Sequence, residues 1–327
     1  MQLSQYLTEI EDTYLPIQKF KISTFLAEKY LVIKKEEIDE ILENNLSIYL
    51  QWEYEEFSKK VEEEILNIKL NLISLVSGWW TTMESLIKKL EKWEINLVNM
   101  VWVIASKYWI WAIDKAILYK IHTVILNKFH AKDQNTLNDL IKLFKTNIII
   151  WNWWLPLIPK EIIEKFQWII LNQHPWPLRK NHLDFGGKGM YWIRVTASRI
   201  IYLLETWATW NELFTESTVH IMTEQFDEWY SVWVKKLNIE KEIGEYRGQI
   251  INKSEDEKEE LLKNLISDIQ AKLLVLEHEN VAETIKTIWE TKITEKHSSY
   301  DEILVPKENV WILEESKQKA IKLYPNG

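Results

Sequence analysis

Residues 70–90 read LNLISLVSGWWTTMESLIKKL, and this stretch decides the fold class. It begins with Leu70–Val76, an apolar run of strand length. After the turn 77–82, hydrophobic residues recur at the i, i+3, i+4 and i+7 spacing of an amphipathic helix, namely Met83, Leu86, Ile87 and Leu90. Thr81 and Glu84 predict a capping box at the start of that helix. A strand, a short turn and a helix in this order predict the beginning of a βαβ unit.

The same alternation of strand and helix continues downstream. Apolar runs predict strands at 97–105, 123–126, 147–150, 169–172 and 217–222, and helical spacing predicts helices at 113–119, 135–145, 161–166 and 195–205. The isoleucines at 148–150 are typical of a strand that is covered on both faces of a parallel sheet. We therefore predict an α/β fold with an open, mostly parallel sheet and helices on both faces. Such sheets bind ligands at the carboxyl ends of their strands.

The two ends of the chain have a different texture, rich in charged residues and in helical hydrophobic spacing. We expect residues 1–68 to form a helical extension, residues 69–245 to form the α/β catalytic domain, and residues 246–327 to form a mainly helical segment that packs on that domain. The extension could serve packing or join copies into a homo-oligomer. We expect one of these two roles for the extension rather than chemistry.

Composition excludes several classes of protein. Lys and Arg number 40 and Asp and Glu number 49, so the net charge is −9 and no basic field attracts nucleic acid. The absence of cysteine excludes a disulfide scaffold, a thiolate zinc site and a cysteine nucleophile. The polar first residues do not predict a signal peptide, and no long apolar stretch predicts a membrane span. We expect a cytoplasmic protein with small-molecule substrates, no nucleic acid partner and no membrane.

The balance between glycine and tryptophan is abnormal. The chain has only 7 glycines and has 19 tryptophans, a sum of 26, whereas average usage predicts roughly 23 glycines. Several tryptophans follow helices or fill turns, where a glycine is usual, namely Trp79, Trp80, Trp93, Trp168, Trp207 and Trp229. We hypothesise that UGA codons read as glycine in the cell are written here as tryptophan. The alternative is a truly tryptophan-rich protein, in which residues such as Trp233 within a predicted strand are genuine.

A polar cluster at two strand ends is the strongest candidate for chemistry. Asn172 and His174 lie two apart at the end of one strand, so their side chains should point the same way. About fifty residues later the segment 218–227 ends in Asp227. An amide and an imidazole can stabilise an oxygen that becomes negative during acyl transfer, and a carboxylate can handle the proton of an attacking amine. The alternative for each residue alone is a hydrogen-bonded structural polar group.

The order of these motifs resembles the formyltransferase family that uses 10-formyltetrahydrofolate. Residues 77–81 resemble its Ser-Gly-Gly-Gly-Thr loop with two glycines replaced, and residues 172–175 match its Asn-x-His-Pro motif. The spacing from His220 to Asp227 matches its His-x₆-Asp motif. The resemblance covers roughly residues 69–240. It implies formyl transfer to a primary amine, most nearly that of glycinamide ribonucleotide in purine synthesis, with 10-formyltetrahydrofolate as co-substrate and no metal.

The resemblance also implies roles for individual residues. The catalytic residues would be Asn172, His174 and Asp227, with His220 supporting them or serving only in strand pairing. The loop at a helix N-terminus would bind the substrate phosphate through Ser77, Gly78, Trp79, Trp80, Thr81 and Thr82. The folate would be held near Trp153, Trp154, Leu155, Leu157, Thr223 and Glu224.

One segment departs from the family pattern and leaves the acceptor open. Residues 176–190 differ from the usual continuation after His-Pro, and they hold three of the seven glycines, which are Gly186, Gly187 and Gly189. This segment could be a variable surface loop or part of an acceptor pocket. The alternatives are therefore another amine such as an amino sugar, water in a deformylase, or a helical interaction protein that has lost catalysis.

Overall fold

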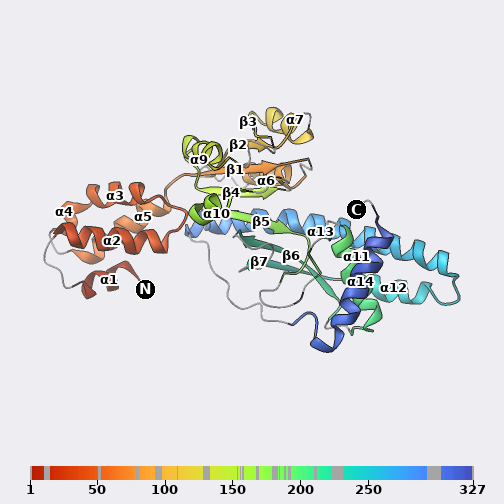
Figure 1. Cartoon of the computed structure of the whole chain (residues 1–327). Coiled ribbons are helices and arrows are strands. Elements are labelled where there is room, and N and C mark those ends of the chain that lie inside the picture. Colours follow the sequence, from red (N-terminus) through yellow and green to blue (C-terminus); the bar gives the residue numbers. More distant parts are fainter. Residues whose placement is uncertain are drawn as a thin grey trace. The chain divides into compact units, whose positions relative to one another are not determined.

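The computed structural model of the chain is shown in Figure 1. It describes residues 2–10, 15–50, 53–78, 81–92, 98–108, 110–127, 133–152, 154, 156, 158–166, 169–178, 183, 185–187, 189–190, 193–209, 212–222, 231–292 and 303–325. The chain divides into two compact units, one with residues 1–170 and 285–295 and the other with 171–284 and 296–327. The division at 68/69 and 245/246 that the sequence suggests stays a prediction.

The first unit contains four parallel strands in the order β3-β2-β1-β4. They are β1 (Leu70–Val76), β2 (Val98–Ala105), β3 (His122–Ile125) and β4 (Ile148–Asn152). Strand β1 lies between β2 and β4, with Leu72 opposite Met100 on one side and opposite Ile148 on the other. This central place explains why β1 is apolar along nearly its whole length, because both of its faces are covered.

A helix follows each of these strands. They are α6 (Thr81–Lys92), α7 (Trp111–Leu118), α9 (Gln134–Leu143) and α10 (Lys160–Phe166). From β1 to β2 to β3 the chain moves in one direction, and from β3 to β4 it moves back past β1. Because parallel crossovers are right-handed, this reversal puts α6 and α7 on one face and α9 on the other. Val76, Met83, Val103 and Ala112 share the core beneath α6 and α7.

The predicted capping box at Thr81 and Glu84 is wrong. Helix α6 begins at Thr81 itself, so Thr81 is the first helical residue rather than the cap. The Glu84 carboxylate instead contacts Nζ of Lys88 at 3.0 Å and Nζ of Lys115 at 3.1 Å. Lys115 belongs to α7, so this buried carboxylate ties the two helices on one face of the sheet together.

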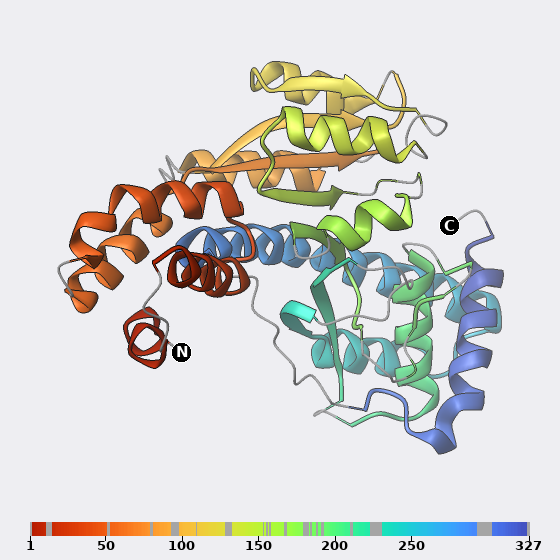
Figure 2. The same cartoon turned by 60° about the vertical axis from the view of Figure 1, so that its left-hand side comes forward.

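The N-terminal residues are helical, as predicted. The helices are α1 (Leu3–Glu9), α2 (Leu15–Lys29), α3 (Lys35–Asn44), α4 (Leu46–Tyr49) and α5 (Tyr54–Leu66). Helix α2 packs against α3, and α3 packs against α5, as Figure 2 shows. Buried Ile38, Leu42, Val61 and Ile65 fill the space between them. A homo-oligomer formed through these helices stays a prediction.

The second unit contains three strands in the order β5-β6-β7, and their pairing is antiparallel. They are β5 (Ile170–His174), β6 (Phe214–Ile221) and β7 (Ser231–Asn238), and β7 contains Trp233 as expected. The helical elements are α11 (Ile193–Glu205), α12 (Glu240–Gln249), α13 (Glu255–Thr291), η2 (Lys307–Asn309) and α14 (Val310–Leu323). The Arg194 guanidinium of α11 donates to the carbonyls of Tyr324 and Pro325 just after α14. These bonds fix the end of the chain on α11.

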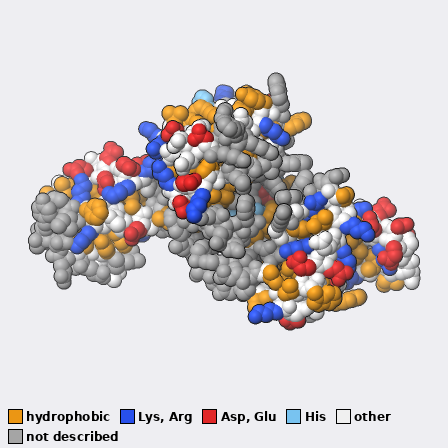
Figure 3. All heavy atoms as spheres, viewed as in Figure 1, with side chains coloured by type: hydrophobic (Ala, Val, Ile, Leu, Met, Phe, Trp, Pro, Cys, Tyr) orange, Lys and Arg blue, Asp and Glu red, His pale blue; other side chains and the backbone are white. Residues whose placement is uncertain are grey.

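The predicted α/β class is confirmed, with parallel strands, connecting helices and helical segments at both ends. On the face in Figure 3, acidic and basic side chains are interspersed over the described surface. Many of these charges form pairs within one helix, such as Lys253 with Glu257 at 2.8 Å. Among the described helices, none combines the length and the hydropathy that crossing a membrane requires.

Candidate active site

The end of β5 and the end of β6 bring the predicted polar residues together. In the antiparallel pairing of these strands, Asn172 lies opposite His220 and His174 lies opposite Thr218. Residues two apart on a strand share a face, so all four side chains belong to one face of the strand pair. The two-residue spacing of Asn172 and His174 therefore places both side chains on one face of β5, as the sequence predicts.

Asn172 and His174 form a directed hydrogen bond. Nδ2 of Asn172 lies 2.9 Å from Nε2 of His174, and Oδ1 of Asn172 accepts the backbone N–H of Gln173 at 2.9 Å. The second bond fixes the orientation of the amide, so its NH₂ group faces the imidazole. Because that group only donates, Nε2 accepts, and the hydrogen-bond network assigns the ring proton of neutral His174 to Nδ1. The pair thus fixes the imidazole of His174 and the amide of Asn172 relative to each other.

His220 lies against the same imidazole. The ring centroids of His174 and His220 are 5.1 Å apart and their planes differ by 13°. Nδ1 of His220 lies 3.1 Å from the carbonyl oxygen of Ile221, so this nitrogen donates its proton to the backbone. His220 is 2% exposed, and His174 is 9% exposed. His220 thus restricts the orientation of the His174 ring without being accessible itself.

Two further residues lie beside His174, and neither has an individual role among the sequence-based predictions. The Trp176 ring centroid lies 4.2 Å from that of His174. Thr218, opposite His174, donates its hydroxyl to the Trp176 carbonyl at 3.0 Å. Thr218 was within the quoted segment 218–227, but a contact across 42 residues depends on strand register. No sequence pattern gives that register.

The arrangement suits stabilisation of a developing negative oxygen. The imidazole N–H of His174 and the amide N–H of Asn172 are donors held by neighbouring groups before any ligand binds. Such preorganised donors are effective because they need little rearrangement during the reaction. Thr218, opposite His174 on the neighbouring strand, donates its hydroxyl to the backbone.

Comparisons with known proteins identify the fold. No protein-family model matches the sequence, and no curated protein matches it. Among solved structures, a phosphoribosylglycinamide formyltransferase from Anaplasma phagocytophilum aligns with 72% of this chain and 97% of its own, at 14% identity and a TM-score of 0.51. A glycinamide ribonucleotide transformylase from Symbiobacterium toebii aligns with 68% of this chain and 88% of its own, at 15% identity and a TM-score of 0.50.

The fold is formyltransferase-like. At these identities the likeness concerns the fold and leaves the activity to be argued from the residues. It accords with the family resemblance that the motifs suggested.

In this formyltransferase-like fold, the turn after β1 leads into the N-terminus of α6. Ser77 and Thr82 are buried, and a Cβ placed on Gly78 would meet no atom within 4 Å. Trp79 and Trp80 lie outside the described residues. Thr81 opens the helix, so the first N–H groups of α6 are oriented toward the turn, as anion binding requires.

The carboxyl end of β4 contributes a buried polar pair. Asn152 donates through Nδ2 to the hydroxyl of Ser74 on β1, and both side chains are buried. Trp154, expected near the folate, is 2% exposed. Trp153, Leu155, Leu157, Thr223, Glu224 and Asp227 lie outside the described residues. Their roles stay predictions.

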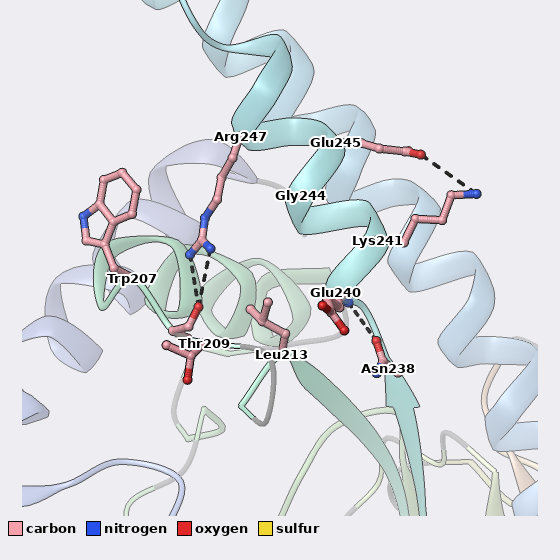
Figure 4. Close-up of a pocket in the computed structure, with 10 residues that line it drawn as sticks. Trp207, Thr209, Leu213, Asn238, Glu240, Lys241, Gly244, Glu245 and Arg247 are labelled. Carbon is pink, nitrogen blue, oxygen red and sulfur yellow. Dashed lines mark hydrogen bonds and ion pairs between the residues drawn. The ribbon is translucent and has the colours of Figure 1, made fainter.

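A separate open cavity of about 810 Å³ lies in the second unit. Its lining includes Trp207, Leu213 and α12 residues such as Gly244 and Arg247 (Figure 4). Leu213 precedes β6, whereas His220 is near the last residue of that strand, so the cavity is at the other end of β6. The Arg247 guanidinium donates to the Ala208 carbonyl and lies 5.4 Å from the Trp207 ring centroid. This cavity is not the predicted site.

Within the described part of the chain, no group of three or more His, Asp or Glu residues is arranged to hold a metal ion.

Proposed function

We propose that the protein transfers a formyl group from 10-formyltetrahydrofolate to a primary amine, with glycinamide ribonucleotide as the first candidate acceptor. The observation that carries the proposal is the Asn172–His174 pair, whose amide is held against the imidazole. The formyltransferase-like fold supports it independently.

The reaction needs one bond to form and one to break. The amine nitrogen attacks the formyl carbon, and the carbonyl oxygen becomes an oxyanion that accepts hydrogen bonds from His174 and Asn172. Asp227 is assigned the removal of the amine proton, by its place in the family motif. The bond from the formyl carbon to N10 then breaks, N10 takes a proton, and tetrahydrofolate and the formylated amine leave. Positioning of two substrates supplies much of the rate.

The turn 77–82 is assigned the phosphate of the acceptor. Backbone N–H groups at the start of α6 would donate to the phosphate oxygens, and the helix dipole favours a negative charge there. A cradle of this kind needs bare backbone. Bulky side chains at 79 and 80 obstruct it, so this assignment is strongest with glycine at both positions.

The test is an assay of tetrahydrofolate release from 10-formyltetrahydrofolate with a panel of acceptors. Release that requires glycinamide ribonucleotide supports the proposal in full. Release that requires an amino sugar keeps formyl transfer and changes the acceptor, which the unusual segment 176–190 leaves open. Release as formate without any amine identifies a deformylase. No release and no binding of reduced folate favours a protein without catalysis.

A further inference from the structure

Trp207 stands where a helix ends in a left-handed residue. Its φ is +51°, and the amides of Trp207 and Ala208 reach back to the carbonyls of Leu204 and Leu203 at 3.3 and 3.1 Å. This pair of bonds is the Schellman motif, in which glycine is the usual residue at the left-handed position. A Cβ strains that conformation. At the end of α11, Trp207 therefore adopts a backbone conformation that is usual for glycine.

Other helix ends show what is particular to Trp207. Lys120 and Lys145 occupy the same left-handed position after α7 and α9, with φ of +58° and +48°. A lysine there extends into water, whereas Trp207 exposes 76% of a large apolar side chain. The glycines Gly187 and Gly189 also take positive φ, of +114° and +85°. These two glycines show that the chain uses glycine at some of its left-handed positions.

Trp176 is the converse case, a buried indole. It is 6% exposed, and among the described residues its Nε1 has no hydrogen-bond partner, as is also true of Nε1 of Trp154 and Trp289. A buried indole N–H normally finds an acceptor. The residue follows Pro175 at a bend, and Pro-Gly is a common turn dipeptide. Its ring also covers His174, the side chain assigned to the formyl oxygen.

Trp102 is a tryptophan whose ring packs against a neighbouring side chain. It lies on β2, and its ring stacks on Phe144 with centroids 4.1 Å apart and planes 12° apart. Glycine at this place would remove the stacking and weaken the strand. Trp102 on β2 therefore differs from Trp207, which stands at a left-handed helix end.

We propose that residues 207 and 176 are glycine in the active protein, encoded by UGA codons, and that Trp102 is a genuine tryptophan. The inference at 207 rests on backbone geometry alone. The functional consequence at 176 rests on the proposed function. A glycine there leaves open the space against the imidazole of His174 that the indole fills, so that the formyl group can approach this side chain.

The gene and the native protein test the proposal without any activity measurement. We expect UGA codons at 207 and 176 and UGG at 102, and we expect peptides of the protein from its own cells to have the mass of glycine at 207 and 176. UGG at 207 and 176 overturns the proposal. A UGA codon with tryptophan in the native peptide also overturns it.

Recombinant variants of the written sequence provide a second test. Trp207→Gly should raise Tm by about 2–4 °C, because it relieves a strained turn. The matched control Trp102→Gly should lower Tm. A fall in Tm for Trp207→Gly as large as that of the control contradicts the assignment.

The consequence at 176 is measured by binding of a non-transferable reduced-folate analogue. Trp176→Gly should tighten binding about tenfold, which corresponds to the factor for each 1.4 kcal/mol. Unchanged or weaker binding contradicts the open space beside His174. If no variant binds folate while the codons are UGA and Tm rises, the proposed function fails and the assignment of glycine at 207 stands.

Discussion

The strand pair β5–β6 and the turn after β1 are both assigned to substrate, but they depend on different parts of the chain. At β5–β6 the proposed chemistry depends on side chains, and strand register holds Asn172 and His174 in place. At the turn 77–82 the proposed phosphate binding depends on backbone N–H groups at the start of α6. A site built from side chains can be recognised from the residue types in the sequence. A site built from backbone is recognised mainly through its glycines, and positions 79 and 80 of this turn are tryptophan in the sequence.

The largest effect should come from the side-chain site. His174→Ala should reduce kcat/KM for formyl transfer by about 10²–10⁴-fold, because the donor to the oxyanion is lost. Steady-state kinetics with 10-formyltetrahydrofolate measure this. His122→Ala is the control, since His122 is an exposed histidine on β3, and it should leave the rate unchanged. Full turnover by the His174 variant would contradict the assignment of the catalytic residues to β5–β6.

The backbone site should respond to the opposite kind of change, the removal of side chains. Trp79→Gly combined with Trp80→Gly should lower the Kd for the phosphate-bearing acceptor about tenfold, because the N–H groups of the turn become accessible. Calorimetric titration measures the Kd. Trp111→Gly, at an exposed tryptophan that begins α7, is the matched control and should have no effect. Equal Kd values for the parent, the double variant and the control would contradict the assignment of phosphate binding to this turn.

A smaller effect tests how β5–β6 is held. Thr218→Val removes the hydroxyl that donates to the Trp176 carbonyl and leaves that carbonyl without its partner. The expected loss is about 1 kcal/mol, or roughly 2–4 °C in Tm. Thr218→Ser retains a hydroxyl and should recover most of the loss. Thermal unfolding measures both variants. Equal Tm values for Thr218→Val and Thr218→Ser would contradict a stabilising role of the hydroxyl.

The smallest effect concerns the helix that follows the turn. Burial raises the pKa of the Glu84 carboxyl, but hydrogen bonds from Lys88 and Lys115 outweigh burial and hold this pKa below its usual value. A carboxyl with a lowered folded-state pKa stabilises the protein above its unfolded-state pKa, and the contribution disappears as pH falls through the folded-state value.

Glu84→Gln should therefore lower Tm by roughly 2 °C at neutral pH. The gap between variant and parent should close as the solution is acidified below the usual range of a glutamate. Glu91→Gln, later on α6, serves as control. A Tm difference that widens on acidification would contradict a stabilising contribution from the ion pairs of Glu84.

The sequence predicted the elements of the fold better than their pairing. Leu70–Val76 is observed as β1 with the predicted bounds, because an apolar run between a polar flank and a turn leaves little choice. The two-residue spacing of Asn172 and His174 likewise predicted a shared face. The antiparallel direction of β5, β6 and β7 did not follow from the pattern, since apolar runs carry no direction.

Contacts that join distant segments were also beyond the sequence. Asn152 bonds to Ser74 across 78 residues, and Thr218 bonds to Trp176 across 42. Each depends on which strands are neighbours and on their register. The capping box failed for a related reason, since Lys115 of another helix engages Glu84. Local patterns predict local structure, and tertiary partners decide what a polar side chain does.

The most direct measurement follows an isotopically labelled formyl carbon from 10-formyltetrahydrofolate by NMR, using protein with glycine at 79, 80, 176 and 207. The account predicts that the label appears in an amide of glycinamide ribonucleotide and that His174→Ala abolishes this signal. Label that remains on the folate, in the presence of bound acceptor and folded protein, would contradict formyl transfer by this chain.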